Sequence, residues 1–250
     1  MSAQQTVLLV GGTGRTGRHV LRQLLERGVS VRAIVRSRAK LPPEVAGDAN
    51  LAVIEASLLS LSDDELEQHL RGCSAVISCL GHVISLKGIY GAPRDLVTRA
   101  ATRLCRAVEA LRPEAPVKLV LLSSVSVTRA GHRDWRRGLF ERALLRVICA
   151  VLPPARDNQR AADFLQKQIG PDNAFVEWVV VRPDSLLEGP VSAYTLHEEL
   201  VNGVFAPGST NMANVARVMC ELVTNAATWA EWTGELPVVV NAGAVRRAGA

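Results

Sequence analysis

The sequence predicts an α/β protein built on a doubly wound parallel sheet, and three observations carry this prediction. Short apolar runs alternate with amphipathic stretches of helical period from residue 7 to residue 181. Strands that alternate with helices form parallel βαβ units with right-handed crossovers, which assemble into a doubly wound sheet. A length of 250 residues is ordinary for one α/β domain. We therefore expect one domain over residues 1–250, with 184–236 contributing a small substrate-side lobe because the regular alternation lapses there.

The strands are predicted from continuous apolar runs, which indicate strands that are buried on both faces of a sheet. In chain order they cover Val7–Val10, Val31–Val35, Leu51–Ile54, Ala75–Leu80, Val117–Ser124, Phe175–Val181 and Pro237–Asn241.

The helices are predicted from apolar residues at intervals of three and four and from their start and stop signals. Ser62 and Glu65 form a capping box in front of a helix that ends near Gly72. Pro153 and Pro154 are expected to stop the helix before them. In chain order the helical patterns cover Val20–Leu25, Leu66–Leu70, Arg94–Leu111, Leu139–Val151, Asp157–Ile169 and Val215–Val223.

The composition excludes several classes of protein. The chain is 48% hydrophobic and 21% charged, and no apolar run approaches the roughly 18 to 20 residues of a membrane span. The first residues, MSAQQ, lack the basic segment of a signal peptide, so we expect a cytoplasmic protein with no membrane partner. The odd number of cysteines and the absence of a C-x-x-C pair predict neither disulfides nor a metal site. We expect reduced core residues at Cys73, Cys79, Cys105, Cys149 and Cys220.

The net charge of +5 is compatible with a nucleic acid or with an anionic small molecule. No nucleic-acid recognition motif and no basic stripe interleaved with aromatic residues accompanies it. We therefore expect a small-molecule substrate and no nucleic acid. Whether the protein is a monomer or a homodimer stays open.

Three glycines at every third position separate the first strand from the first helix. Gly11, Gly14 and Gly17 lie where such a turn bends tightly, where the backbone approaches a pyrophosphate, and where the helix packs on the sheet. The helix N-terminus offers backbone N–H groups to the anion. A tight turn without a ligand is the alternative, but the order strand, glycines, helix favours a dinucleotide site.

The residues after the second strand predict which dinucleotide binds. NAD-preferring proteins place Asp or Glu there to bond the ribose, whereas this chain has Arg36, with Arg38 and Lys40 just beyond and Arg15 in the glycine turn. No carboxylate is present to repel a phosphate. The expected cofactor is NADP(H).

Several motifs in order resemble one family: "VLLVGGTGRTGRHV", "VRAIVRSRAKL", "AVISCLGH", "VKLVLLSS" and "VVVRPDSLL". They are similar to the atypical short-chain dehydrogenase/reductase group, which includes NmrA-like proteins and flavin and biliverdin reductases. The resemblance implies a Rossmann fold, NADP binding and a substrate cleft at the carboxyl ends of the strands. Beyond the glycines and basic residues above, it assigns to the cofactor Thr13, Thr16, Ser57, Leu58, Leu80, Gly81, Ser123 and Pro183.

The chain departs from the wider superfamily at two places. The catalytic Tyr-x-x-x-Lys of relatives should fall in "PARDNQRAADFL", where Ala155 and Gln159 occupy the two positions. Tyr90 begins "YGAPR", which imitates the spacing elsewhere, so we expect no proton relay through a tyrosine. Ser57 stands where relatives carry the Asp that bonds the adenine amine.

Ser124 and His82 are the candidate catalytic residues. Ser124 ends the fifth predicted strand, where relatives place a hydroxyl that bonds cofactor or substrate, although such a hydroxyl can equally satisfy the backbone. His82 follows the fourth strand at the cofactor edge and is a candidate acid or, alternatively, a structural histidine. These residues predict an NADPH-dependent oxidoreductase that transfers hydride to a conjugated acceptor such as a flavin, quinone or enone. The alternative is a non-catalytic NADP-binding redox sensor that acts through a protein partner.

Overall fold

The computed structural model describes residues 5–82, 91–131, 152–203 and 208–243. Its main sheet has eight strands in the order β3-β2-β1-β4-β5-β6-β10-β8. Every neighbouring pair is parallel except β8 and β10, which are antiparallel. The strands are β1 Thr6–Val10, β2 Ser30–Val35, β3 Leu51–Glu55, β4 Ala75–Ser78, β5 Val117–Leu122, β6 Val176–Pro183, β8 Tyr194–His197 and β10 Val238–Asn241. The strand order reverses between β1 and β4, so the predicted doubly wound Rossmann fold is confirmed.

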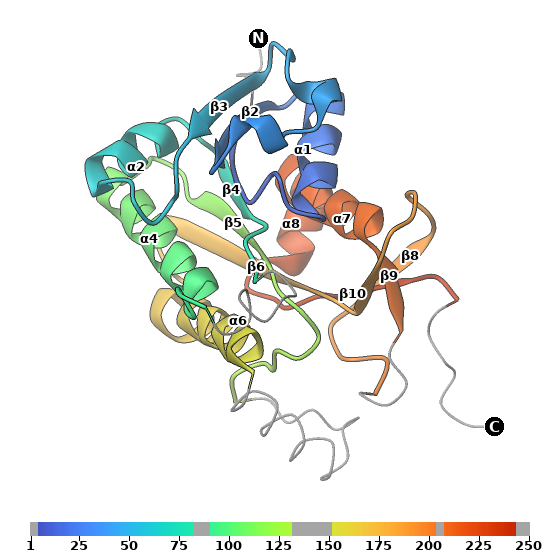
Figure 1. Ribbon diagram of the computed structural model, residues 1–250. Coiled ribbons are helices and arrows are strands. Elements are labelled where there is room, and N and C mark those ends of the chain that lie inside the picture. The colour runs from blue at the N-terminus through green and yellow to red at the C-terminus, as the bar shows by residue number, and fades with distance from the viewer. Residues whose placement is uncertain (1–4, 83–90, 132–151, 204–207, 244–250) are drawn as a thin grey trace, which may run out of the picture.

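The helices cover both faces of this sheet (Figure 1). The first group packs on one face and the second on the other, which gives three layers. The first group is α1 Gly17–Glu26, α7 Met212–Thr224 and α8 Ala226–Trp232. The second group is α2 Asp63–Leu70, α4 Leu96–Leu111 and α6 Pro153–Phe164, which continues into the π-helical turn η3 Leu165–Ile169. Two short 3-10 helices, η1 Arg38–Lys40 and η2 Pro43–Val45, follow β2.

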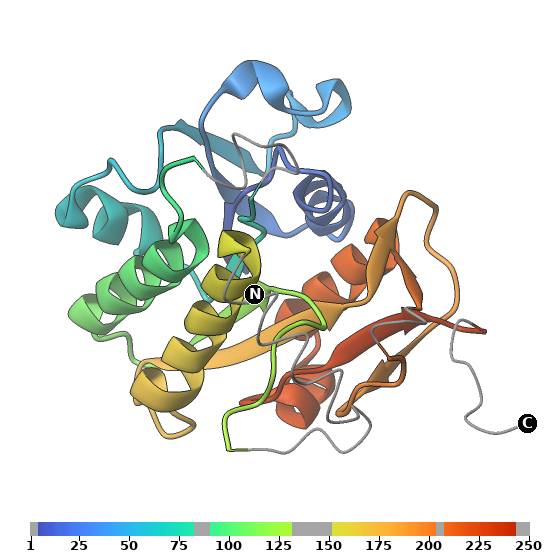
Figure 2. The ribbon, with the colours of Figure 1, turned by 60° about the horizontal axis from the view of Figure 1, so that its bottom comes forward.

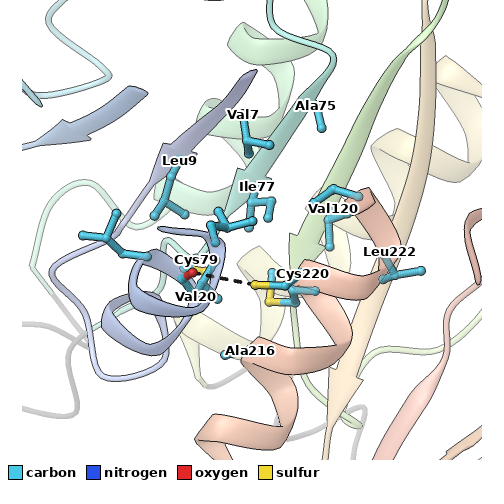
Figure 3. Close-up of a cluster of buried hydrophobic side chains, with 14 of the residues drawn as sticks. Val7, Leu9, Val20, Ala75, Ile77, Cys79, Val120, Ala216, Cys220 and Leu222 are labelled. Atoms are coloured by element: carbon cyan, nitrogen blue, oxygen red, sulfur yellow. Dashed lines mark hydrogen bonds between the residues drawn. The ribbon is translucent and has the colours of Figure 1, made fainter. Parts of the chain in front are cut away.

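Alternate residues of the central strands supply the two cores, because successive side chains of a strand point to opposite faces. Val7 and Leu9 of β1 pack toward α1 and α7, together with Ile77 of β4 (Figure 3). Leu8 and Val10 pack toward α4 and α6 on the other face. On that face α4 and α6, green and yellow in Figure 2, lie side by side.

The described cysteines are free and buried, as predicted, and Cys149 lies outside the described residues. Burial raises the pKa of the Cys220 thiol to about 12, and burial likewise raises the pKa of Cys79. The Cys220 thiol donates to the Val20 carbonyl oxygen at 3.7 Å (Figure 3). These thiols act as core residues.

Local signals placed most element boundaries within a few residues, but the start of α6 was wrong, and strand β8 and helix α8 were not predicted. The capping box is present: the Glu65 backbone donates to Ser62 Oγ at 3.2 Å, and the Ser62 backbone donates to Glu65 Oε2 at 2.7 Å. Helix α6 begins at Pro153, before the expected start at Asp157, because proline fits the first helical turn, where its missing N–H is not needed. The helix predicted over Leu139–Val151 lies outside the described residues.

Residues 184–236, the predicted substrate-side lobe, contain two kinds of structure. Strands β7 Ser185–Leu187 and β9 Ser209–Asn211 pair in parallel as a separate ribbon. Helices α7 and α8 instead pack against the main sheet, and Trp229 and Trp232 of α8 are buried in its core. Among the described residues, no helix has the length and apolar character needed to cross a membrane.

Candidate functional site

Two glycines that admit no side chain shape the turn between β1 and α1. Gly11 has a φ of +78°, and a Cβ there would lie 2.6 Å from the carbonyl carbon of Cys79, just beyond β4. A Cβ on Gly17 would lie 2.1 Å from the Gly11 carbonyl oxygen. The first glycine therefore lets the turn pass against β4, and the last lets α1 start directly on the turn.

Helix α1 opens onto this turn without a side-chain cap. Thr16 at the N-cap makes no side-chain cap hydrogen bond, and the first turn of the helix contains no acidic residue. A helix N-terminus carries partial positive charge and N–H groups without intrahelical acceptors. The turn and the helix end thus have the form that holds a phosphate in dinucleotide-binding proteins.

A carboxylate from a distant segment lies over the start of α1. Glu188, which follows β7, is 2.9 Å from Arg18 Nη2 and 3.6 Å from Arg15 Nε. Its other oxygen is 3.7 Å from His19 Nε2. The side chains of Glu188 and the two arginines are half-exposed, whereas that of His19 is 13% exposed. Three basic groups therefore converge on one anion beside the glycine turn.

His19 is held between these charges as a neutral ring. Arg22 Nη2 lies 3.1 Å from His19 Nδ1, so the ring accepts a hydrogen bond there and carries its proton on Nε2. Burial lowers the pKa of His19, and repulsion from Arg22 and Arg18 lowers it further. A pocket of about 490 Å³ opens beside His19. It is lined by Thr13, Arg18, His19, Arg22, Lys40, Leu41, Pro42, Pro43 and Glu44.

The basic residues after β2 have different surroundings. Arg38 Nη2 donates to the Val53 carbonyl oxygen at 3.1 Å and so joins η1 to β3. Arg36 is exposed directly after β2, and Lys40 lines the pocket beside α1. In the described part of the chain, neither Arg36 nor Lys40 has an ion-pair partner. Both side chains can therefore bind an anionic ligand without first breaking an ion pair.

The turn after β3 contains the next two predicted cofactor residues. Ser57 is exposed and Leu58 is buried. Arg103 of α4 donates to the carbonyl oxygens of Leu58 at 2.7 Å and Leu61 at 2.6 Å. The turn is therefore anchored by α4 while the Ser57 side chain faces outward.

His82 and Asp157 form a buried pair at the carboxyl end of the sheet. Leu80, Gly81 and His82 follow β4, and His82 Nε2 lies 2.8 Å from Asp157 Oδ2 near the start of α6. The two side chains are 5% and 0% exposed. A buried carboxylate is costly unless its oxygens are hydrogen-bonded.

The Asp157 carboxylate is fully bonded, because it also caps α4. Its Oδ2 accepts from the Val97 backbone at 2.8 Å, and its Oδ1 accepts from the Thr98 backbone at 3.0 Å. The Thr98 hydroxyl donates to Oδ1 at 2.6 Å. One carboxylate thus joins α6, the start of α4 and the segment after β4.

The serines after β5 differ in their bonding. Ser123 is 8% exposed, and its hydroxyl has no hydrogen-bond partner in the part of the chain that the structure describes. Ser124 Oγ lies 2.6 Å from Ser126 Oγ, so that hydroxyl is engaged within the same turn. An unpaired buried hydroxyl is costly, which makes Ser123 a group that a ligand could satisfy.

Pro183 is the last residue of β6, and its neighbours hold the segments around it. Asp184 Oδ2 accepts from the Gly208 backbone at 2.9 Å and from Asn202 Nδ2 at 3.2 Å. Arg182 is 4% exposed and donates to the carbonyl oxygens of Leu236 at 2.7 Å, Val127 at 3.1 Å and Glu198 at 2.9 Å. The Arg-Pro-Asp sequence therefore ties β6 to the region around β8 and β9.

The positions matched to the Tyr-Lys pair lie on α6 beside Asp157. Ala155 lies in the first turn of α6, and Gln159 bonds the Thr128 backbone through both its amide oxygen, at 2.9 Å, and its amide nitrogen, at 3.1 Å. Gln159 thus anchors the loop after β5. Tyr90 lies outside the described residues. Within those residues no group of acidic, histidine or cysteine side chains could hold a metal ion.

Comparison with known proteins identifies the family. Residues 11–226 match the model of a family described as NAD(P)H-binding. The chain belongs to this NAD(P)H-binding family. An uncharacterized chloroplastic protein of Arabidopsis thaliana is 29% identical over 124 residues, which are 50% of this chain and 42% of that protein. The chain thus spans less than half the length of this relative.

Solved structures share the fold of this NAD(P)H-binding protein at low identity. The oxidoreductase ylbE of Lactococcus lactis has a TM-score of 0.67 and 19% identity, covering 95% of this chain and 91% of that one. A candidate NADH-flavin reductase of Streptococcus pneumoniae has a TM-score of 0.65 and 17% identity over 95% and 99%. A short-chain dehydrogenase/reductase of Veillonella parvula in complex with NADP has a TM-score of 0.66 and 15% identity, covering 97% of each chain.

Sequence reasoning missed the residues whose partners are far away in the chain. Asp157 lies in the segment compared with Tyr-x-x-x-Lys, but nothing near it in the chain indicates its partner His82, which lies 75 positions away. Glu188 follows two leucines in a stretch without a motif. The spacing of Arg18 and Arg22 along α1, with Arg15 in the turn before it, was a usable signal, because residues four apart share one helix face.

Proposed function

We propose that this NAD(P)H-binding protein is an NADPH-dependent oxidoreductase that transfers hydride to a small conjugated acceptor. The observation that carries the proposal is the basic end of β2: Arg36 directly follows β2, the neighbour of β1, where NAD-preferring proteins have a carboxylate, and Lys40 lines a pocket with Thr13 of the glycine turn. The Veillonella structure that contains NADP supports the same choice. When bound, NADPH supplies the hydride.

The glycine turn fits such a cofactor. Gly11 and Gly17 leave no room for side chains, the end of α1 is uncapped, and the Ser123 hydroxyl is buried and unpaired. In the proposal the turn and α1 bind the pyrophosphate, Arg36 and Lys40 bind the 2′-phosphate, and Pro183 forms a rigid wall for the nicotinamide.

A conjugated acceptor makes the smallest demand on the residues present. A carbonyl reductase must protonate a developing alkoxide, usually with a positioned tyrosine. The matched positions hold Ala155 and Gln159, and Gln159 is occupied with Thr128. A flavin, quinone or enone spreads the incoming charge over its π-system, so orientation can supply much of the rate. Ser124 and His82 are proposed to orient it.

Exposed apolar side chains near Pro183 support a flat, apolar acceptor. Three of the four exposed large apolar residues of the described chain lie in one segment after it, at Leu186, Leu187 and Val191. Such side chains offer apolar surface to a ligand that binds beside them. The Streptococcus relative described as a candidate flavin reductase points to the same class.

Fluorescence titration with NADPH and NADH tests the cofactor. A hydrogen bond to a charged group contributes about 1.5 to 3 kcal/mol, so NADPH should bind at least about tenfold more tightly than NADH. Arg36→Ala should remove most of that preference. Arg106→Ala, an exposed position of α4 on the far face of the sheet, is the charge-matched control. Equal affinities for the two cofactors would contradict the proposal.

Steady-state assays with a panel of quinones, flavins, enones and simple ketones test the reaction. The absorbance of the reduced nicotinamide measures turnover. Quinones, flavins or enones should turn over and simple ketones should not. Ser124→Ala and His82→Ala should each lower turnover by less than about a thousandfold, within the range of one weak donor. Efficient ketone reduction would overturn the acceptor class. Tight NADPH binding without any turnover would instead favour a redox sensor.

A further inference from the structure

The buried pair of His82 and Asp157 suggests a role for the carboxylate that the proposed function does not assign. Asp157 is fully buried and accepts four hydrogen bonds, from His82, the Val97 backbone, the Thr98 backbone and the Thr98 hydroxyl. Three of these donors belong to the start of α4, where any capping acceptor would satisfy them. The fourth is an imidazole from the segment after β4.

The bonding pattern decides which nitrogen of His82 carries the proton. The backbone N–H groups of Val97 and Thr98 can only donate, and the positive end of α4 favours a charged carboxylate. A charged carboxylate only accepts. His82 Nε2, at 2.8 Å, must therefore be the donor, which leaves Nδ1 with its lone pair in the neutral ring.

The pair stands where the acceptor is expected. Strands β4 and β5 are neighbours, with Ser78 opposite Leu121, so the segments that carry His82 and Ser124 leave the same edge of the sheet. Ligands of doubly wound proteins bind at this edge. Asp157 lies between Ala155 and Gln159, the positions matched to the catalytic pair. In the described part of the chain, no residue bonds His82 Nδ1.

We propose that Asp157 is the positioning residue of His82: it holds the proton on Nε2 and turns Nδ1 into the group that meets the acceptor. This inference rests on the proposed function. An acceptor that has taken up hydride needs one proton. In the imidazolium form of His82 the Nδ1–H bond breaks and an O–H or N–H bond forms on the acceptor. The ring is then neutral, and its Nε2–H still donates to the Asp157 carboxylate. Solvent returns a proton to Nδ1.

Asp157→Asn tests the inference with a nearly isosteric side chain. With its amide nitrogen at the position of Oδ2, the Asn side chain would donate to His82 Nε2 and so move the ring proton to Nδ1, and it would lose the hydrogen bond from the Val97 backbone. Nitrogen NMR of protein labelled in its five histidines reads the tautomer directly, with His82→Gln assigning the signal. We expect Nε2–H in the native protein and Nδ1–H in the variant. Turnover of the best acceptor should fall about ten- to a hundredfold, with its KM and the NADPH Kd within about twofold.

Thr98→Val is the matched control, because it removes one hydrogen bond to Asp157 without touching His82. It should lower the melting temperature as Asp157→Asn does, yet keep the native tautomer and turnover within about threefold. The double variant His82→Gln with Asp157→Asn should be no slower than His82→Gln alone.

Each of three results would overturn this inference without contradicting the proposed function. They are Nδ1–H in the native protein, unchanged turnover in Asp157→Asn, and an equal loss of turnover in Thr98→Val. Failure of the proposed function looks different, because native protein would then reduce no acceptor in the panel. In that case the ring-nitrogen signals still decide whether Asp157 controls the tautomer.

Discussion

Two carboxylates join distant parts of this chain, Asp157 behind His82 and Glu188 over the start of α1, and they do so in opposite ways. Asp157 is 0% exposed and bonded by an imidazole, two backbone N–H groups and a hydroxyl. Glu188 is 51% exposed and lies 2.9 to 3.7 Å from two arginines and a histidine. The buried one has fewer charged neighbours but more complete hydrogen bonding.

The difference teaches that burial and hydrogen bonding, not the number of opposite charges, decide what a carboxylate does. When a buried carboxylate is removed, each of its hydrogen-bond partners is left unsatisfied in an apolar interior, which is costly. An exposed ion pair is weakened by water and salt and exchanges easily. Asp157 is thus suited to hold a fixed geometry. The ion pairs of Glu188 with Arg15 and Arg18 are suited to be replaced by ion pairs between these arginines and a bound phosphate.

The largest expected effect is on stability at Asp157. Asp157→Ala should lower the free energy of unfolding by about 3 to 5 kcal/mol, because it removes the cap of α4 and leaves His82 buried without its hydrogen-bond partner. Glu188→Ala should cost less than about 1 kcal/mol. Urea unfolding of both variants measures the two values. Similar losses would contradict the distinction.

Thr98→Val sharpens the comparison by removing one bond of the buried network. The Thr98 hydroxyl donates to Asp157 at Oδ1, 2.6 Å, and contacts its carbonyl oxygen at 3.1 Å. Its loss should cost about 1 to 2 kcal/mol, between the two carboxylate variants. The same urea experiment provides the value. A cost equal to that of Asp157→Ala would mean that the hydroxyl alone holds the network.

Glu188→Gln should raise the affinity for NADPH by about two- to fivefold at low salt, because the carboxylate no longer competes for Arg15 and Arg18. The gain should shrink at high salt. Glu114→Gln, at an exposed position after α4, controls for the net charge. Weaker NADPH binding in Glu188→Gln would show that Glu188 closes over the cofactor rather than competing with it.

The smallest expected effect is the pH dependence at His19. Its pKa is lowered in the folded protein by burial and by Arg22 and Arg18, so the unfolded chain binds the proton more readily. Stability from neutral His19 is therefore complete above the ordinary pKa of about 6.5, and falls with pH toward the lowered value. NMR titration measures that value. Glu188→Gln should lower it further, since Glu188 raises it, and an unchanged value would exclude this coupling.

Features that depend on near neighbours in the chain could be predicted. Seven of the eight strands of the sheet, the turn at Gly11 and the capping box of Ser62 with Glu65 follow from periodicity, backbone geometry and contacts a few residues apart. The start of α6 was expected at Asp157 rather than Pro153 because proline serves equally as a stop after one helix and as the first residue of the next. Strand β8 was not predicted, because Tyr194–His197 is not a continuous apolar run.

The sequence by itself determined the α/β class, the glycine turn and the basic character after β2, because each is written within a single strand-turn-helix unit. Only the tertiary structure decided that Asp157 meets His82, 75 positions away, and that Glu188 meets Arg18, 170 positions away. Such pairs form because parallel strands bring their carboxyl ends to one edge and set helices side by side. Short-range patterns carry no information about which distant side chains that packing joins.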